Sequence, residues 1–265
     1  MNRHIILTSG RSGSNYLANL LNQHPHIVNY GEILAKVIIP YKFFHKCKNC
    51  KLCPCPWTVH NYLNGFYNTK SFFYVAQFYS VYAHLRSKKP INFKMRHKLK
   101  SIGTKDFFLN LRVTGAEDYF ATNKDIIIIH LYRENILRRY LSNLSMQVTG
   151  IVHTEKSLEV PKLTVDIAHM LTHLDVISKE VADENRILNR LKEHQRISIK
   201  YEDFFADEKL TQSYVQQIFE LLGVEPLQIK SKQKKILPQD MRELVSNYNE
   251  FCERLHNTQY QQYLD

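Results

Sequence analysis

An unbroken apolar run at Ile126–Tyr132 (IIIIHLY) limits the possible folds of this chain more than any other part of its sequence. Consecutive β-branched residues predict a strand that is covered on both faces, as the strands of parallel sheets are. Shorter runs at residues 4–9, 91–95 and 197–201 predict three further strands. The sequence therefore predicts a parallel sheet that is buried on both faces.

Apolar side chains at helical spacing separate these strands. A leucine stripe over residues 17–21 predicts a helix that ends before Pro25, and a second helix directly follows residue 132. Further helices are expected over 167–191 (as one long helix or a helical pair), over 215–222 up to Gly223, and from Pro238 to 255. Strands that alternate with helices indicate an α/β fold with helices on both faces of the sheet. No linker divides the pattern, so we expect a single domain over residues 1–265.

The segment between the first strand and the first helix, residues 8–14, reads TSGRSGS. Such a turn leaves backbone N–H groups unpaired at a helix N-terminus, where the helix dipole also attracts negative charge. Gly10 and Gly13 let the backbone approach an anion closely, and the guanidinium of Arg11 matches phosphate or sulfate oxygens. Further donors come from Ser12, Ser14 and Asn15. We expect an anion site here, and the alternative is a strand–turn–helix connection without a ligand.

This turn differs from the Walker A loop of nucleoside triphosphatases. Its two glycines are three residues apart rather than five, and no Lys-Ser/Thr pair follows the second one. The strand at Ile126–Tyr132 also ends without the carboxylate that usually helps to hold Mg²⁺. We therefore expect a P-loop-like sheet that binds its ligand without magnesium, which disfavours an ordinary nucleotide kinase.

Residues 8–17 (TSGRSGSNYL), followed by His24-Pro25 and Gly31-Glu32, resemble the 5′-phosphosulfate loop of sulfotransferases that use 3′-phosphoadenosine 5′-phosphosulfate (PAPS). The resemblance is to the bacterial carbohydrate and tyrosylprotein branches, which carry Arg where the cytosolic steroid and phenol enzymes carry Lys. Four more stretches agree in order and spacing, and the resemblance spans almost the whole chain. They are Phe93-Lys94, Tyr132-Arg133 through Ser142, Tyr201 to Phe204, and Ser246 to Asn249.

The resemblance implies how the nucleotide end of PAPS is held. Arg133 and Ser142 would bind the 3′-phosphate, and Tyr201 would line the adenine pocket or else be a core tyrosine. The nine-residue spacing from Arg133 to Ser142 is one residue away from the commoner eukaryotic pattern and suits the trehalose-type bacterial enzymes. The alternative for this helix is a solvated polar face.

Sulfuryl transfer needs charge stabilisation on the leaving oxygen and a base for the acceptor hydroxyl. Arg11 and the N–H groups that follow it are placed for the first task. Glu32 is the expected base, because the Gly-Glu of the tyrosylprotein branch supplies that group, and the alternative is an exposed loop carboxylate. His97 is the second candidate for the base, or a basic surface residue, and Lys94 would help to neutralise the bridging oxygen.

Four of the five cysteines lie within nine residues: Cys47, Cys50, Cys53 and Cys55. The short spacing is typical of a metal knuckle, and thiolates suit Zn²⁺, which would pin a Cys-rich insertion around residues 40–60. The alternative is a reduced loop without metal. An odd number of cysteines argues against a disulfide framework, and the N-terminus lacks a signal-peptide pattern, so we predict a cytoplasmic protein.

A formal net charge of +11 favours a polyanionic partner: nucleic acid, an anionic membrane or a phosphorylated small molecule. No apolar run reaches the ~20 residues of a membrane span. With the resemblance, we expect a PAPS-dependent sulfotransferase whose acceptor is a hydroxyl of a carbohydrate or glycolipid rather than of a small phenol. The alternative is a basic nucleic-acid-binding protein that uses residues 88–100 and the cysteine knuckle. The aromatic residues of 62–82 are expected mainly in the core, with a few available to an acceptor.

Overall fold

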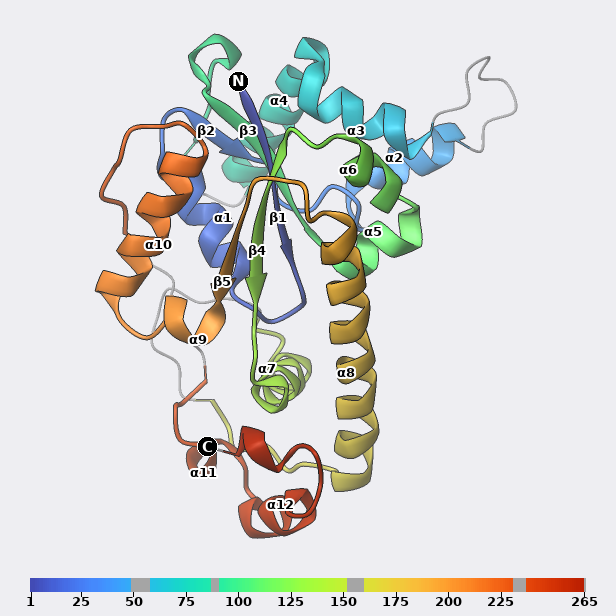
Figure 1. Ribbon diagram of the computed structural model, residues 1–265, viewed down its shortest axis with the longest axis vertical. Coiled ribbons are helices and arrows are strands. Elements are labelled where there is room, and N and C mark those ends of the chain that lie inside the picture. The colour runs from blue at the N-terminus through green and yellow to red at the C-terminus, as the bar shows by residue number, and fades with distance from the viewer. Residues whose placement is uncertain (49–57, 87–90, 152–159, 231–236, 265) are drawn as a thin grey trace.

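The computed structural model describes residues 1–48, 58–86, 91–151, 160–230 and 237–264, which form an α/β fold (Figure 1). Five strands in these residues make one sheet in the order β2-β3-β1-β4-β5. They are β1 (Asn2–Thr8), β2 (Ile27–Asn29), β3 (Ser101–Phe107), β4 (Ile126–Tyr132) and β5 (Arg196–Lys200). All neighbouring pairs are parallel, so the predicted fold class is confirmed.

The side chains of β4 alternate between two helical layers. Ile127 and Ile129 face the layer made by α1 (Ser14–Gln23) and α10 (Glu208–Leu221). Ile126 and Ile128 face the opposite layer. Each of the four is at most 4% exposed, which explains the unbroken apolar run in the sequence.

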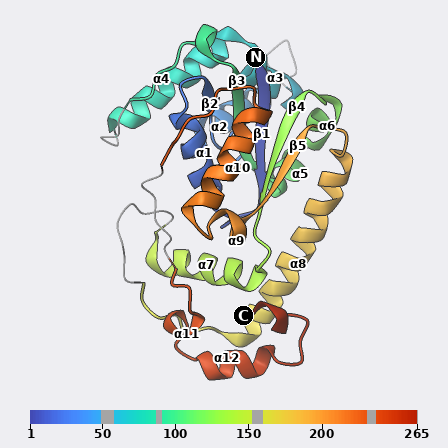
Figure 2. The same ribbon diagram turned by 60° about the vertical axis from the view of Figure 1, so that its left-hand side comes forward.

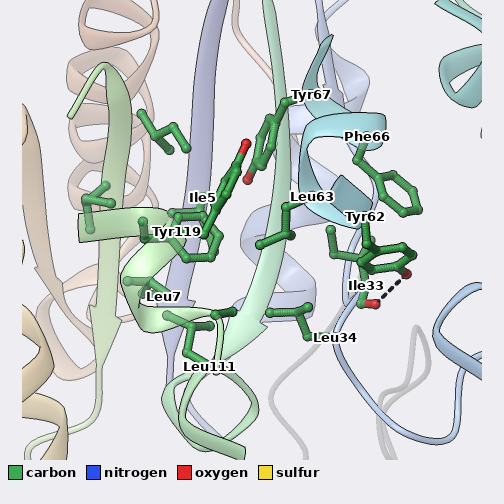
Figure 3. Close-up of a cluster of buried hydrophobic side chains, with 14 of the residues drawn as sticks. Ile5, Leu7, Ile33, Leu34, Tyr62, Leu63, Phe66, Tyr67, Leu111 and Tyr119 are labelled. Atoms are coloured by element: carbon green, nitrogen blue, oxygen red, sulfur yellow. Dashed lines mark hydrogen bonds between the residues drawn. The ribbon is translucent and has the colours of Figure 1, made fainter. Parts of the chain in front are cut away.

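The second layer is rich in tyrosine and phenylalanine. It contains α3 (Val59–Asn68), α5 (Phe108–Thr114) and α6 (Glu117–Thr122), and α2 (Ile39–Lys48) and α4 (Lys70–Arg86) lie beside them. Figure 3 shows Tyr67 and Tyr119 beside Ile5 of β1, and Tyr62 beside Ile33 at the other side of the same cluster. The Tyr62 hydroxyl donates to the carbonyl of Ile33 at 2.7 Å, which satisfies a polar group in an otherwise apolar layer. The prediction of mainly core aromatics over 62–82 thus holds for part of that stretch. Tyr62, Phe66, Tyr67 and Phe73 are buried and Phe72 and Tyr74 pack against the same cluster, whereas Phe78, Tyr79 and Tyr82 of α4 are exposed.

A third cluster lies beyond the carboxyl ends of the strands (Figure 2). It joins α7 (Ile136–Thr149), α8 (Ile167–Arg190), α11 (Met241–Leu244) and α12 (Tyr248–Leu255). The prediction of one helix from Pro238 to residue 255 is wrong, because this stretch forms two short helices, α11 and α12, with a break between them. In the break, Leu163 N–H donates to Leu244 O at 2.7 Å and Ser246 N–H donates to Leu163 O at 2.9 Å. Residues 167–191 do form one long helix, of 24 residues.

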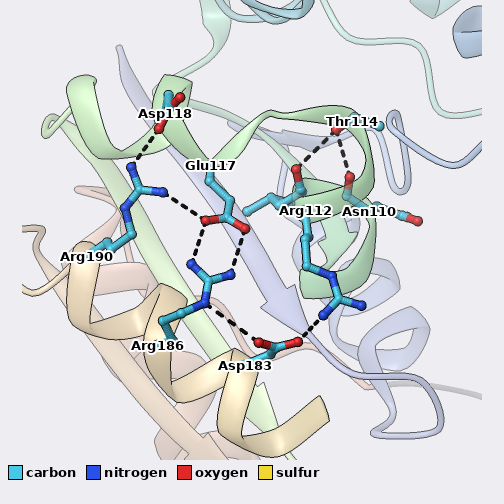
Figure 4. Close-up of polar contacts among 9 residues, drawn as sticks. Asn110, Arg112, Thr114, Glu117, Asp118, Asp183, Arg186 and Arg190 are labelled. Atoms are coloured by element: carbon cyan, nitrogen blue, oxygen red, sulfur yellow. Dashed lines mark hydrogen bonds and ion pairs between the residues drawn. The ribbon is translucent and has the colours of Figure 1, made fainter. Parts of the chain in front are cut away.

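Ion pairs fasten α8 to the α5–α6 region (Figure 4). Glu117 accepts two hydrogen bonds from Arg186, both at 3.0 Å, and one from Arg190 at 2.8 Å. Arg190 also reaches Asp118 at 2.6 Å, and Asp183 pairs with Arg112 of α5. The network fixes the position of α8, which lines one side of the cavity described below.

One predicted strand is wrong. Residues 91–95 pair with no strand of the sheet and lead into a 3₁₀ turn, η1 (Arg96–Lys98). Lys94 N–H donates to Gln77 Oε1 at 3.0 Å, so this segment lies along α4. The sheet instead uses β2 and β3, which the sequence did not predict, because β2 has three residues and the sequence of β3, SIGTKDF, is mostly polar. The remaining short elements are α9 (Tyr201–Phe204) and η2 (Gln261–Tyr263).

Candidate transfer site at the carboxyl edge of the sheet

The turn between β1 and α1 has a backbone that turns sharply twice. Arg11 and Gly13 both have positive φ, 65° and 80°, and Gly13 is the N-cap of α1. No side chain caps this helix and its first turn has no acidic residue. Its first N–H groups therefore have no partner within the helix and present partial positive charge at the carboxyl edge of the sheet.

The serine side chains of the turn differ in where they lie. The Ser12 hydroxyl is fully buried, donates to Ser9 O at 2.7 Å and contacts the Thr8 hydroxyl, so it shapes the turn from within. Thr8 Oγ1 also donates to Leu131 O at 2.8 Å, which ties the turn to β4. Ser14 is buried, and the Asn15 side chain is exposed. The hydroxyl of Ser12 therefore offers no outward donor, although its N–H remains in the turn.

Arg11, Arg133 and Ser142 come together although up to 131 residues separate them in the sequence. Arg11 Nε donates to Ser142 Oγ at 3.0 Å, and Arg133 Nη1 donates to Arg11 O at 3.3 Å. Arg11 follows β1, Arg133 follows β4, and Ser142 is on α7. β1 and β4 are the neighbours at which the strand order reverses, the place where open α/β sheets bind ligands.

The guanidinium of Arg133 is buried and incompletely paired. Its side chain is 7% exposed, and its carbon Cζ lies 4.3 Å from the centre of the Tyr201 ring. Nε is buried without a hydrogen-bond partner among the described residues, and the nearest carboxylate, Glu202, is 3.9 Å away. Burial lowers the pKa of Arg133, with Tyr201 and Glu202 acting in the opposite sense. A buried cation with an unused donor favours the arrival of an anion.

Tyr201 and Phe205 form an aromatic wall against the turn. Their ring centroids are 4.6 Å apart, and Phe205 also packs on Tyr16 of α1. A Cβ added at Gly13 would lie 2.5 Å from the Phe205 ring and 3.3 Å from Tyr201. The structure thus places Tyr201 beside both the turn and Arg133, where a ring can stack on a planar base.

Glu32 is held by a lysine that sequence reasoning missed. Lys105, near the carboxyl end of β3 and with a side chain only 2% exposed, forms an ion pair with Glu32. Lys105 Nζ also lies 4.7 Å from the ring centre of Phe107. Glu32 is therefore a partly covered carboxylate with a fixed partner rather than a loose surface group. A single lysine within a buried strand could have indicated that Lys105 has an acidic partner. This signal could not be used because β3 was not predicted from the sequence.

Asp106 anchors the loop that carries Glu32. Asp106 Oδ2 accepts the N–H groups of Ile33 at 3.0 Å and Leu34 at 3.1 Å, and Oδ1 accepts from Asn110 at 2.8 Å. Burial raises the pKa of Asp106 to about 7, opposed by these hydrogen bonds. Two successive residues of β3 therefore hold the Glu32 loop: Lys105 binds the Glu32 side chain, and Asp106 binds the backbone N–H groups of the two residues that follow Glu32.

A cavity of about 250 Å³ opens between the turn and α8. Ser9, Gly10 and Arg11 line one side, Phe108 lines another, and Glu184 lies on the wall formed by α8. The Ser9 hydroxyl donates to Glu184, whose carboxylate is also 3.6 Å from the guanidinium of Arg139 on α7. Burial raises the pKa of Glu184. This acid was not identified from the sequence because it lies in a helix among other charged residues.

Lys94 and His97 do not reach this site. Both precede β3 and lie at the amino ends of the strands, opposite the turn. Lys94 is 7% exposed, and its ammonium donates to the carbonyls of Asn22 and His24 at 2.7 Å and to that of Ile27. His97 is exposed on η1. The expectation that Lys94 neutralises the bridging oxygen is corrected: the lysine instead satisfies carbonyls at the end of α1.

The cysteine cluster cannot be placed in the same detail. Cys50, Cys53 and Cys55 lie outside the described residues, and of Cys47 only the backbone, in the last turn of α2, is described. Within the described part of the chain no group of His, Cys, Asp or Glu residues could hold a metal ion. The zinc knuckle therefore stays a prediction.

Comparisons with known proteins find matches among solved structures. No model of a known protein family matches the sequence, and no curated protein matches it. Among solved structures, the crystal structure of a sulfotransferase from Alicyclobacillus acidocaldarius matches with a TM-score of 0.47 and 14% sequence identity. That match covers 100% of this chain and 94% of the other. No residue of the site is assigned from it.

Proposed function

We propose that this protein transfers a sulfuryl group from PAPS to a hydroxyl of an acceptor. The observation that carries the proposal is the pair of contacts joining Arg11 to Ser142 and Arg133 to the Arg11 carbonyl. Two anion-binding elements, one after β1 and one after β4, thereby form one continuous site. PAPS carries negative charge at both ends, so a site of this kind suits it.

The residues then divide into two binding roles. Arg11 and the N–H groups of Gly13 and Ser14 bind the 5′-phosphosulfate, and Arg133 with Ser142 binds the 3′-phosphate. Tyr201 stacks on the adenine. Ser142 already accepts from Arg11 Nε, so it positions that guanidinium as well as binding phosphate.

In the transfer step the acceptor oxygen forms a bond to sulfur while the bond from sulfur to the bridging phosphate oxygen breaks. The hydroxyl proton passes to Glu32, and negative charge develops on the leaving bisphosphate, where Arg11 stabilises it. Lys105 keeps the carboxylate of Glu32 oriented. Glu184, which lines the cavity, is the second candidate for the base.

An acceptor that binds beside Lys105 would give its proton to Glu32. An acceptor in the 250 Å³ cavity beside the turn would give it to Glu184, because Glu184 lines this cavity and Glu32 does not. The walls of the cavity combine an aromatic ring, Phe108, with hydrogen-bonding groups of Ser9, Arg139 and Glu184. This mixture suits a sugar ring, which has both an apolar face and several hydroxyls, and the volume lies below the ~300–1,000 Å³ of drug-sized sites. We therefore retain a carbohydrate hydroxyl as the acceptor.

The test is calorimetric titration with adenosine 3′,5′-bisphosphate, beside ADP and ATP–Mg²⁺. We expect binding of the bisphosphate to be at least tenfold tighter than binding of either competitor. Arg11→Ala and Ser142→Ala should each weaken it by about tenfold or more, because a charge-assisted contact contributes ~1.5–3 kcal/mol. The matched control is Arg254→Ala, which removes an exposed arginine of α12 and should leave binding unchanged. Equal affinity for ATP–Mg²⁺ would contradict the proposal.

Transfer itself is tested with PAPS carrying labelled sulfur and a panel of sugars, glycolipids and tyrosine peptides. Glu32→Gln should abolish sulfation while leaving bisphosphate affinity within twofold, because Glu32 acts on the acceptor side. Sulfation that persists in Glu32→Gln and is lost in Glu184→Gln assigns the base to Glu184. Sulfation lost in neither variant refutes a carboxylate base.

The nucleic-acid alternative gains no support from the described residues of the basic stretch 88–100. Lys94 is buried and bonded to α1, and Asn92 donates to Asn22 O at 2.8 Å. Residues 91–100 therefore serve partly to hold the end of α1, and they form no strand that could present an aromatic and basic surface to RNA.

A further inference from the structure

The positive charge of this chain is concentrated in one segment. Residues 33–105 contain 14 Lys and Arg and not one Asp or Glu. The rest of the chain has 22 basic and 25 acidic residues and so carries a net charge of −3. The whole excess of +11 therefore comes from the segment that contains α2, α3 and α4. The transfer site does not account for this, since Arg11, Arg133 and Arg139 all lie outside the segment.

The same segment exposes apolar side chains on one face of α4. Val75, Phe78, Tyr79, Tyr82 and Leu85 follow the spacing i, i+3, i+4, i+7 and i+10, and their exposed fractions run from 43% to 68%. Residues at this spacing share one face of a helix. The opposite face is in the core, where Phe73 is fully buried and Gln77 is 3% exposed.

The segment 91–95 extends this face. The ring of Phe93, 40% exposed, lies 6.0 Å from the ring of Phe78, and the Lys94–Gln77 hydrogen bond holds the segment against α4. Ile91 and Met95 are exposed as well. We call this set the α4 face: Val75, Phe78, Tyr79, Tyr82, Leu85, Ile91, Phe93 and Met95. Soluble monomers rarely expose so many contiguous large apolar side chains without a partner.

Cations border the α4 face. Arg86 ends α4 on the same face and is exposed, Lys70 begins the helix and is exposed, and Lys98 follows the segment 91–95. Exposed aromatic and aliphatic side chains bordered by Lys and Arg are the pattern of a helix that lies in a membrane interface. None of the described helices is long and apolar enough to cross a bilayer, so contact at the surface is the mode that this pattern permits.

We propose that the α4 face docks on the surface of an anionic lipid bilayer, with its apolar side chains in the interface and its cations against the headgroups. Two copies of the chain meeting at this face would bring two acid-free basic segments together, which like-charge repulsion opposes. Nucleic acid would satisfy the charge, but Val75, Leu85 and Ile91 have no ring to stack on a base and would stay exposed to water. A bilayer satisfies both the charge and the apolar side chains.

The test is flotation of the full chain with vesicles of phosphatidylcholine alone or with 30% phosphatidylglycerol. We expect binding to the anionic vesicles at least tenfold stronger than to the neutral ones, and loss of most of that binding in 1 M NaCl. Arg86→Gln should weaken partitioning roughly fivefold, the contribution of one cation near an anionic surface. Phe78→Ser combined with Leu85→Ser should weaken it by about tenfold or more.

Matched controls and opposing outcomes keep the test decisive. Val176→Ser and Leu210→Ser remove similarly exposed apolar side chains outside the segment and should leave vesicle binding unchanged. Equal loss in these controls, or equal binding to neutral and anionic vesicles, overturns the proposal. So does a dimer in sedimentation velocity that Phe78→Ser dissociates, which assigns the face to a second copy. The fourth outcome is tight binding to duplex DNA in the absence of vesicle binding. If Arg86→Gln weakens that DNA binding and Phe78→Ser does not, the positive charge serves nucleic acid and the proposal is overturned.

Discussion

Replacing Gly13 with alanine should destabilise the protein through two effects that the structure separates. The residue has φ of 80°, and a side chain in this left-handed region costs about 1–2 kcal/mol. The new Cβ would also lie 2.5 and 2.7 Å from two atoms of the Phe205 ring. That ring packs against Tyr16, Phe204 and Tyr201 at centroid distances of 4.6 to 4.9 Å, so it has little room to move away.

The expected magnitude follows from adding the two effects. Forcing an extra methyl group into packed surroundings costs about 1–3 kcal/mol, so the free energy of unfolding should fall by roughly 2–5 kcal/mol. For a chain of this length each kcal/mol lowers Tm by about 2–4 °C, which gives a decrease of roughly 4–20 °C.

Thermal unfolding followed by circular dichroism measures this change, and the chain provides its own control. A Cβ added at Gly10 meets nothing within 4 Å, and Gly10 does not have positive φ, so Gly10→Ala should leave Tm within about 1 °C. An equal decrease of Tm in the two variants, or an unchanged Tm in both, would refute the packing of Phe205 against the turn. Calorimetry at 15 °C, where both variants are folded, should show that Gly13→Ala also weakens binding of adenosine 3′,5′-bisphosphate.

Three further predictions concern stability. Lys94→Met leaves the carbonyls of Asn22, His24 and Ile27 without their donor and should cost about 3 kcal/mol in urea unfolding. The kcat of the proposed transfer should stay within twofold, and a large loss of kcat without destabilisation would restore a catalytic role. Glu117→Gln should cost about 1–2 kcal/mol at low salt and clearly less in 1 M NaCl. Hydrogen bonding from Arg186 lowers the pKa of Glu117, so its stabilisation is present above the unfolded value of about 4.3 and is lost as pH falls through the folded pKa; acid unfolding of wild type and Glu117→Gln checks this. Burial raises the pKa of Asp106 to about 7, so the folded chain binds more protons than the unfolded one between about pH 4 and 7, and the stability contributed at this site falls as pH rises through that window. Asp106→Asn should flatten the dependence of Tm on pH between 5 and 8, and an unchanged profile would refute the assignment.

Local sequence patterns were sufficient to predict those longer apolar strands whose side chains are covered on both faces of the sheet. Ile126–Tyr132 was predicted with its observed bounds because every residue except the last, Tyr132, is buried. The stretch 91–95 (INFKM) alternates apolar and polar residues as a half-buried strand does, yet its apolar residues are exposed and its lysine is buried. The spacing of apolar residues shows which side chains point the same way, but it does not show whether another element packs against them. The strand predicted over 91–95 is wrong because that packing depends on the tertiary structure.

The site was predictable where a motif carries its own geometry. The turn with Arg11 was expected from its own sequence, and Arg133 and Ser142 from the family resemblance; the structure brings the three residues into contact, and their binding roles remain predictions. Lys105 and Glu184 were missed because each acts through a contact 73 and 175 residues distant in the chain, with Glu32 and Ser9 respectively. Contacts at such separations leave no local pattern.

The position of β1 at the centre of the sheet has a consequence for synthesis of the chain. β1 ends at residue 8, but its two neighbours in the sheet, β3 and β4, end at residues 107 and 132. At ~5–20 residues per second, roughly 6–25 s pass between completion of β1 and completion of β4. Neither edge of β1 has its partner until β3 is complete, and the second edge stays unpaired until β4 is complete. An unpaired edge of an apolar strand is a template for pairing with another chain, so chains stalled before residue 126 should aggregate through β1.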